Sequence, residues 1–106
     1  MNVRIEHTLH FTAGVHWNNQ MIMNGYRLTV YMVTNVKESE YINIAFERLK
    51  HFINQEIDSS IFIRSDEYEA CRLYIAAGLN ITTLPLEPVD QIIGLMLFHK
   101  LNAIME

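Results

Sequence analysis

The chain has 106 residues, of which 50% are hydrophobic, and its 8 basic and 12 acidic side chains give a formal net charge of −4 at pH 7. This length is close to the commonest domain size, and no Pro-, Gly- or Ser-rich linker divides the sequence, so we expect one domain spanning residues 1–106. The basic residues are scattered, which argues against nucleic-acid binding. The sole cysteine cannot form an internal disulfide and the first residues are strand-like, so we expect a cytoplasmic protein.

In two segments of the first third of the chain, residues suited to the core alternate with residues suited to solvent, as in strands with one buried face. They cover residues 3–13 and 26–33, and the second is rich in β-branched and aromatic residues. We expect them to pair as an antiparallel hairpin. Residues 14–20 are the predicted connection, and Asn24-Gly25 is predicted to form a second turn or a bulge.

The apolar period becomes helical after Asn35, which we expect to cap a helix together with Glu38, three residues further on. Apolar residues from Ile42 to Ile57 share one face of this helix. Residues 61–63 are consecutive apolar residues, which predicts a short buried strand.

Ser65 is expected to cap a second helix, and Gly78 is expected to end it as the residue after the C-cap. Residues 80–84 again resemble a strand. The last helix is predicted to start at Pro88, because a proline at the first helical position loses no hydrogen bond, and to continue to Glu106.

This last helix is apolar over more of its circumference than the roughly 100° stripe of an ordinary surface helix. Its longest apolar run, residues 95–98, is far shorter than the roughly 20 residues of a membrane span, so no membrane contact is expected. We expect a buried or interface helix that contacts a second copy or a larger protein through Leu97, Phe98 and Leu101. Gly94 lies inside this helix, where a glycine lowers stability by roughly 1 kcal/mol relative to alanine. Either the missing side chain lets two backbones approach closely, or a well-buried helix simply tolerates the glycine.

Together these segments predict an α+β fold in the order ββαβαβα. The antiparallel hairpin sheet is expected to be packed on one face by about three helices.

Three histidines, His7, His10 and His16, fall within ten residues, and imidazole is a common metal ligand. His7 and His10 lie on opposite faces of a strand, so only His10 and a His16 brought round by the connection can converge on a metal. The alternative is a hydrogen-bonded inward His7 with solvated His10 and His16.

Trp17, Asn18 and Asn19 place an aromatic ring beside two amides, a combination that suits a contact patch for a ligand or a protein. The alternative is that Trp17 folds back over the open end of the core.

Phe11-Thr12-Ala13-Gly14 is similar to the start of a Phe-Ser-Ala-x-His strand, and Tyr26-Arg27-Leu28-Thr29-Val30 is similar to a strand that follows a His-x-His pair. In these segments the chain resembles the tunnelling fold of the 6-pyruvoyl-tetrahydropterin synthase group, which implies ββαα as an alternative architecture. Val15 stands where the first metal-binding His of that group lies, and Ile22 and Asn24 stand where its paired His residues lie. The resemblance therefore implies no activity.

The sequence has no Gly-rich phosphate loop, nucleophile elbow or paired Cys motif, and no cofactor is expected. We expect a small cytoplasmic protein–protein interaction or regulatory module that acts as an oligomer or accessory subunit. The alternative is an enzyme, or a degenerate enzyme-derived domain, with a small-molecule site between subunits near His10, His16 and Trp17.

Overall fold

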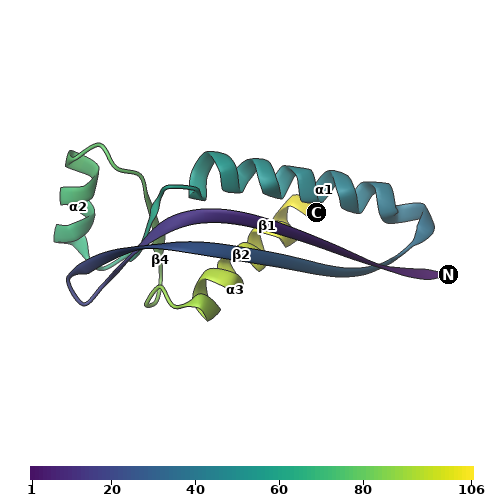
Figure 1. Ribbon diagram of the computed structural model, residues 1–106, viewed down its shortest axis with the longest axis horizontal. Helices are drawn as coiled ribbons and strands as arrows, with labels where there is room; N and C mark the ends of the chain where they lie inside the picture. Colours follow the sequence, from purple (N-terminus) through teal and green to yellow (C-terminus); the bar gives the residue numbers. More distant parts are fainter.

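The computed structural model describes residues 1–106, and a long β-hairpin dominates it (Figure 1). Strands β1 (Asn2–Trp17) and β2 (Gln20–Asn35) have 16 residues each and pair antiparallel over their whole length. The molecule is accordingly elongated, with extents of 52 × 24 × 23 Å.

A two-residue turn closes the hairpin. Asn18 and Asn19 have φ values of 54° and 59°, the left-handed conformation at both central positions that defines a type I′ turn. Asparagine adopts this conformation more readily than most residues. The predicted connection over residues 14–20 was therefore too long, because the strands continue to Trp17 and from Gln20. The predicted turn or bulge at Asn24-Gly25 was also wrong, since Gly25 pairs in register with Thr12.

The predicted alternation along the hairpin is confirmed. Leu9, Phe11 and Ala13 of β1 are buried, while the residues between them are exposed. On β2, Leu28 and Val30 lie opposite Leu9 and His7 and are partly buried on the same face. One face of the hairpin thus forms a side of the core.

The helix after β2 begins as its sequence predicts. The side chain of Asn35 accepts a hydrogen bond from the Glu38 N–H at 3.0 Å, across a short 3₁₀ turn, η1 (Val36–Glu38). Helix α1 (Ser39–Phe52) follows and runs into a π-helical turn, η2 (Ile53–Ile57). The predicted apolar face is buried. Its buried members are Ile42, Ala45, Phe46, Leu49, Ile53 and Ile57.

The second half of the chain contains β3 (Ile61–Arg64), α2 (Tyr68–Ala76), β4 (Ile81–Leu84) and α3 (Asp90–Met105). The order ββαβαβα and both short strands are therefore confirmed. Gly78 has a φ of 82°, as expected of a residue that ends a helix. Two helices start later than predicted, since Ser65 lies in a turn before α2 and Pro88 lies before α3.

The four strands form one mixed sheet in the order β2-β1-β3-β4. β3 is parallel to β1 and pairs with it only at Gly14 and Val15, and β4 is parallel to β3. This confirms the α+β class and adds a parallel part to the predicted hairpin sheet. The ββαα alternative lacks β3 and β4.

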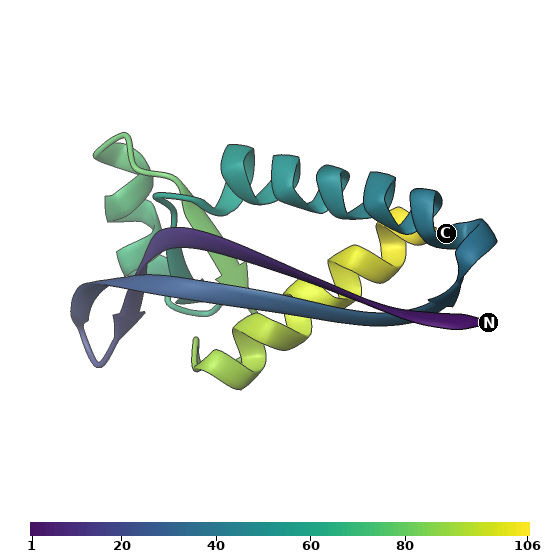
Figure 2. The same ribbon diagram turned by 45° about the vertical axis from the view of Figure 1, so that its right-hand side comes forward.

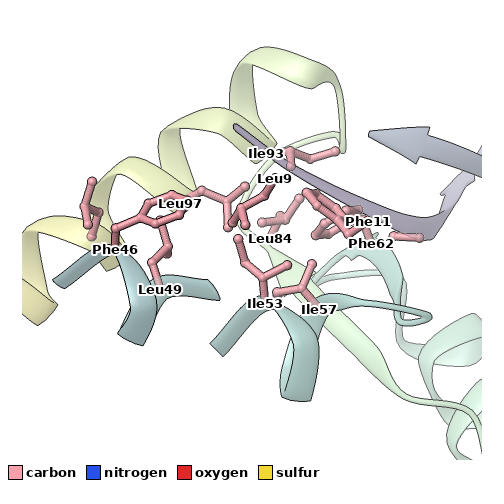
Figure 3. Packing of buried hydrophobic residues seen from close by; sticks show 12 residues of the cluster. Leu9, Phe11, Phe46, Leu49, Ile53, Ile57, Phe62, Leu84, Ile93 and Leu97 are labelled. Carbon is pink, nitrogen blue, oxygen red and sulfur yellow. The ribbon is translucent and has the colours of Figure 1, made fainter. Parts of the chain in front are cut away.

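α1 and α3 lie together against the buried face of the hairpin (Figure 2). Side chains from both helices meet those of β1, β3 and β4 in one core (Figure 3). α2 instead contacts the opposite face, because its Tyr74 meets His16, which alternates with the core-facing Val15 along β1. Two helices thus share the predicted face, and the contact with His16 assigns α2 to the other face, at the end of the molecule where the hairpin turn lies (Figure 1).

Candidate functional site

The outer edge of β2 is open along the full length of the sheet, because β2 is the first strand in the sheet order. The Thr12 and Gly14 N–H groups point away from β2, toward Asp58 and Ser60. In an antiparallel pair, successive residues direct their N–H and C=O groups alternately toward the partner strand and away from it. Gly25 and Met23 lie opposite Thr12 and Gly14, so their N–H and C=O groups, and those of every second residue along β2, point to the free edge.

Nothing in the sequence of β2 blocks this edge against pairing. Exposed edge strands usually carry charged residues, proline or a bulge that prevents another strand from adding. β2 has Arg27 as its only charged residue, has no proline, and pairs with β1 without a bulge. The edge is therefore suited to accept another strand.

An apolar groove of about 430 Å³ lies between β2 and α3. Leu28 and Met32 line it from β2, and Phe98 lines it from α3 with 58% of its surface exposed. Leu97 and Leu101 also line the groove but are buried in the core of the same chain. Of the three predicted contact residues on this helix, only Phe98 presents a large exposed side chain.

Gly94 also borders this groove. A Cβ atom added to it would meet no atom within 4 Å, so within one chain no backbone approaches closely there. The close approach expected for this glycine does not occur inside the chain.

At the hairpin turn, Trp17, Asn18 and Asn19 are all exposed, and Trp17 exposes 58% of its surface. Trp17 therefore does not fold back over the core, and the three residues remain a candidate contact patch.

His16 is buried, with 7% of its surface exposed, on the face of the sheet that α2 covers. Its Nδ1 lies 2.7 Å from the Tyr74 hydroxyl, and the two rings meet edge to face. Its Nε2 is buried without a hydrogen-bond partner, and the nearest acidic oxygen is Glu67 Oε2 at 4.0 Å. Burial raises the pKa of Tyr74 above its ordinary value of 10.0, so this phenol keeps its proton at neutral pH.

Arg64, at the end of β3, holds the adjacent acidic residues. Its guanidinium pairs with Asp66 and Glu87 and lies 3.5 Å from Glu67 Oε1. The hydrogen bond to Asp66, together with all three carboxylates, raises the pKa of Arg64, although desolvation opposes the shift. Glu67 is therefore held by Arg64 through one oxygen, while its other oxygen faces His16.

The structure does not bring His10 and His16 to one place. His10 is exposed and borders a different hollow, beside Asp58. No group of three or more His, Cys, Asp or Glu side chains is placed to hold a metal ion. His7, in contrast, has its Nε2 3.0 Å from the Asn43 Oδ1 and stacks on Phe46. Metal binding by His10 and His16 stays a prediction.

Comparisons with protein-family models, curated proteins and solved structures found no match. No helix is long and apolar enough to span a membrane.

Sequence reasoning singled out His16 but missed its neighbours Tyr74 and Glu67. Tyr74 is 58 positions away from His16 along the chain. The contact depends on α2 crossing to the second face of the sheet, which no local pattern specifies. The sequence offered no signal for this contact: the small residue Gly14 is explained by the neighbouring strands, because a Cβ there would approach Met21 Sδ of β2 to 3.0 Å and Ile61 Cγ1 of β3 to 3.2 Å.

Proposed function

We propose that this chain is a small cytoplasmic protein–protein interaction module that forms a two-fold dimer through the open edge of β2, and that it acts as an oligomer or accessory subunit. The observation that carries this proposal is the unblocked edge of β2 lying directly beside an apolar groove. Adding a strand to such an edge satisfies the free backbone groups, while alternate side chains of the added strand fill the groove.

A second copy of β2 has the chemistry that this site requires. Leu28, Val30 and Met32 alternate along β2 and point to the side of the sheet where the groove lies. In an antiparallel pair of β2 strands, the same residues of the partner therefore continue the apolar surface toward Phe98. Arg27 is the only charge on the strand, so a register that keeps the two copies of Arg27 apart meets no repulsion.

The size of the interface supports the use of both the edge and the groove. β2 is about 50 Å long, so a strip as wide as one strand spacing covers roughly 250 Å². A stable complex buries about 800 Å² on each partner. The α3 side of the groove must therefore be covered as well as the strand edge, and two-fold symmetry does this for both copies.

The test compares two substitutions at Thr29, whose N–H is on the free edge. Thr29→Pro removes that N–H without removing a hydrogen bond to β1, and proline is tolerated in this position of an edge strand. Thr29→Ala is the matched control, because both variants lose the hydroxyl that lies 3.3 Å from Thr8 Oγ1. Sedimentation equilibrium should show a dimer for the wild type and for Thr29→Ala, and a monomer for Thr29→Pro.

Phe98→Asp provides a second, independent variant that does not alter the strand. Because Phe98 is largely exposed, the fold should survive, as judged by circular dichroism, and the dimer should dissociate. A monomeric wild type at 100-micromolar concentration, a trimer or larger ring, or a folded Thr29→Pro variant that remains dimeric would each overturn the proposal.

A further inference from the structure

A cavity of about 290 Å³ lies between the hairpin turn and α2, and His16 is one of the residues that line it. Buried polar atoms nearly always have a hydrogen-bond partner, since leaving one unpaired costs about 1–3 kcal/mol. The His16 Nε2 has none. An unpaired nitrogen on a buried ring that borders a cavity indicates a binding role.

The His16 ring is fixed in orientation. Its Nδ1 is paired with the Tyr74 hydroxyl at 2.7 Å, and the edge-to-face contact with the Tyr74 ring has a centroid separation of 5.5 Å. The 2.7 Å contact fits either ring tautomer, and we assign the proton to Nδ1, so that His16 donates to the Tyr74 oxygen and its Nε2 is an acceptor. This acceptor faces Glu67, which lines the same cavity.

The other polar groups of the cavity are mainly acceptors. Glu67 and Glu69 line it, and no lysine or arginine does. Arg64 lies near Oε1 of Glu67, so Oε2 is the oxygen left facing His16. Glu69 pairs with Arg72 at the surface, where a salt bridge contributes little. The cavity therefore favours a ligand that is positively charged and rich in hydrogen-bond donors.

The remaining lining indicates the size and kind of the cation. Ala70 and Leu73 supply apolar surface, and a cavity of 290 Å³ is much larger than a bare ion. A metal ion would also find too few ligands, because His16, Glu67 and Glu69 line the cavity but are not placed together as a group that could hold a metal. The cavity lies at the carboxyl ends of the parallel strands β1 and β3, where ligands of sheets with helices on both faces commonly bind.

We infer that this cavity binds a small organic molecule through a protonated primary amine. The ammonium group donates to the His16 Nε2 and the Glu67 Oε2, and its third N–H is directed to the side chain of Asn19. The carbon chain of the ligand contacts Ala70 and Leu73. Binding of this kind does not depend on the dimer, since β2 and α3 do not line the cavity.

The test is a titration of the ¹⁵N-labelled full chain with n-butylamine, with n-butanol as the neutral probe of the same length. The His16 Nε2 resonance should shift saturably with the amine and should not respond to the alcohol. Glu67→Gln should weaken amine binding at least tenfold. Glu87→Gln is the matched control, because Glu87 also pairs with Arg64 but lies outside the cavity, and this variant should bind as the wild type does.

Glu67 is 36% exposed in its side chain, so Glu67→Gln should fold, and its unfolding curve will verify this. An unsaturable response to the amine, an equal response to the alcohol, or unchanged affinity in Glu67→Gln would overturn the inference. Saturable binding of Zn²⁺ at His16 that excludes the amine would also overturn it, in favour of a metal site.

Discussion

Leu97 and Phe98 are neighbours in α3, and the structure predicts that shortening Leu97 to alanine lowers the stability of the fold much more than shortening Phe98 does. Leu97 is 3% exposed and belongs to the core, whereas Phe98 is 58% exposed and borders the groove. Replacing a buried leucine with alanine costs about 2–5 kcal/mol, depending on how far the site relaxes. Because Leu97 also borders the groove, the site can relax and water can enter, so we expect a loss of about 2.5 kcal/mol.

For a domain of this size, roughly 4 °C of melting temperature corresponds to 1 kcal/mol, so Leu97→Ala should melt about 10 °C below the wild type. Phe98→Ala should melt within about 2 °C of the wild type when both are dilute enough to be monomeric, because exposed substitutions usually change stability by less than 0.5 kcal/mol. Calorimetry at low protein concentration measures both values. Equal losses in the two variants, or a Leu97→Ala protein as stable as the wild type, would refute the described packing of α3.

Three further substitutions test local features of the fold. Asn19→Gly should stabilise the chain by about 0.5 kcal/mol in urea unfolding, because glycine adopts the left-handed conformation of the type I′ turn without steric cost; a loss of stability would show that the Asn19 side chain contributes contacts of its own. Asn35→Ala should cost about 1 kcal/mol by removing the cap on the Glu38 N–H, and an unchanged urea midpoint would contradict that role. Tyr74→Phe should cost about 1 kcal/mol at pH 7, because His16 Nδ1 loses its partner. The folded state raises the pKa of Tyr74, so it binds the phenolic proton more tightly than the unfolded state, and stability is lost as pH rises above about 10. The difference between wild type and Tyr74→Phe should therefore narrow between pH 9 and 11, and a constant difference would contradict the pKa direction.

Local patterns predicted the elements well where one face of a segment is buried and the other is not. The period-2 alternation of residues 3–13 and the helical period from Ile42 to Ile57 each report a single buried face, and both are observed. The Asn35 cap was also predictable, because its hydrogen bond joins residues only three positions apart. The connection was predicted over residues 14–20, although Asn18 and Asn19 alone are sufficient for a type I′ turn because both adopt the left-handed conformation.

Long-range features were not predictable in the same way. Ile61, Phe62 and Ile63 are all buried, which shows that β3 is covered on both faces, but a continuous apolar run does not say which helix covers which face. The placement of α2 on the second face is what brings Tyr74 and Glu67 to His16. Similarly, the apolar circumference of α3 indicated a buried helix, yet it could not separate Leu97, which the chain buries itself, from Phe98, which it leaves exposed.

Because β1 contacts β3 over only a short length, we expect two regions of the protein to differ in their free energy of local unfolding. β1 pairs with β3 only at Gly14 and Val15, but there the Gly14 N–H donates to the Ser60 carbonyl and the Thr12 carbonyl accepts from the Ser59 N–H, so this end of the hairpin has backbone hydrogen bonds on both sides of β1. Toward Asn2 the hairpin pairs with no third strand, and it is joined to the helices by the chain connection through η1 into α1 and by side-chain packing. In native-state hydrogen exchange, amides near the N-terminal end of β1 and the C-terminal end of β2 should therefore exchange through partial opening, while those around Gly14 and β3 should require global unfolding. The end of the hairpin near Asn2 can therefore open while the region around Gly14 and β3 stays folded. A partner strand paired along the whole of β2 would make the two regions unfold together.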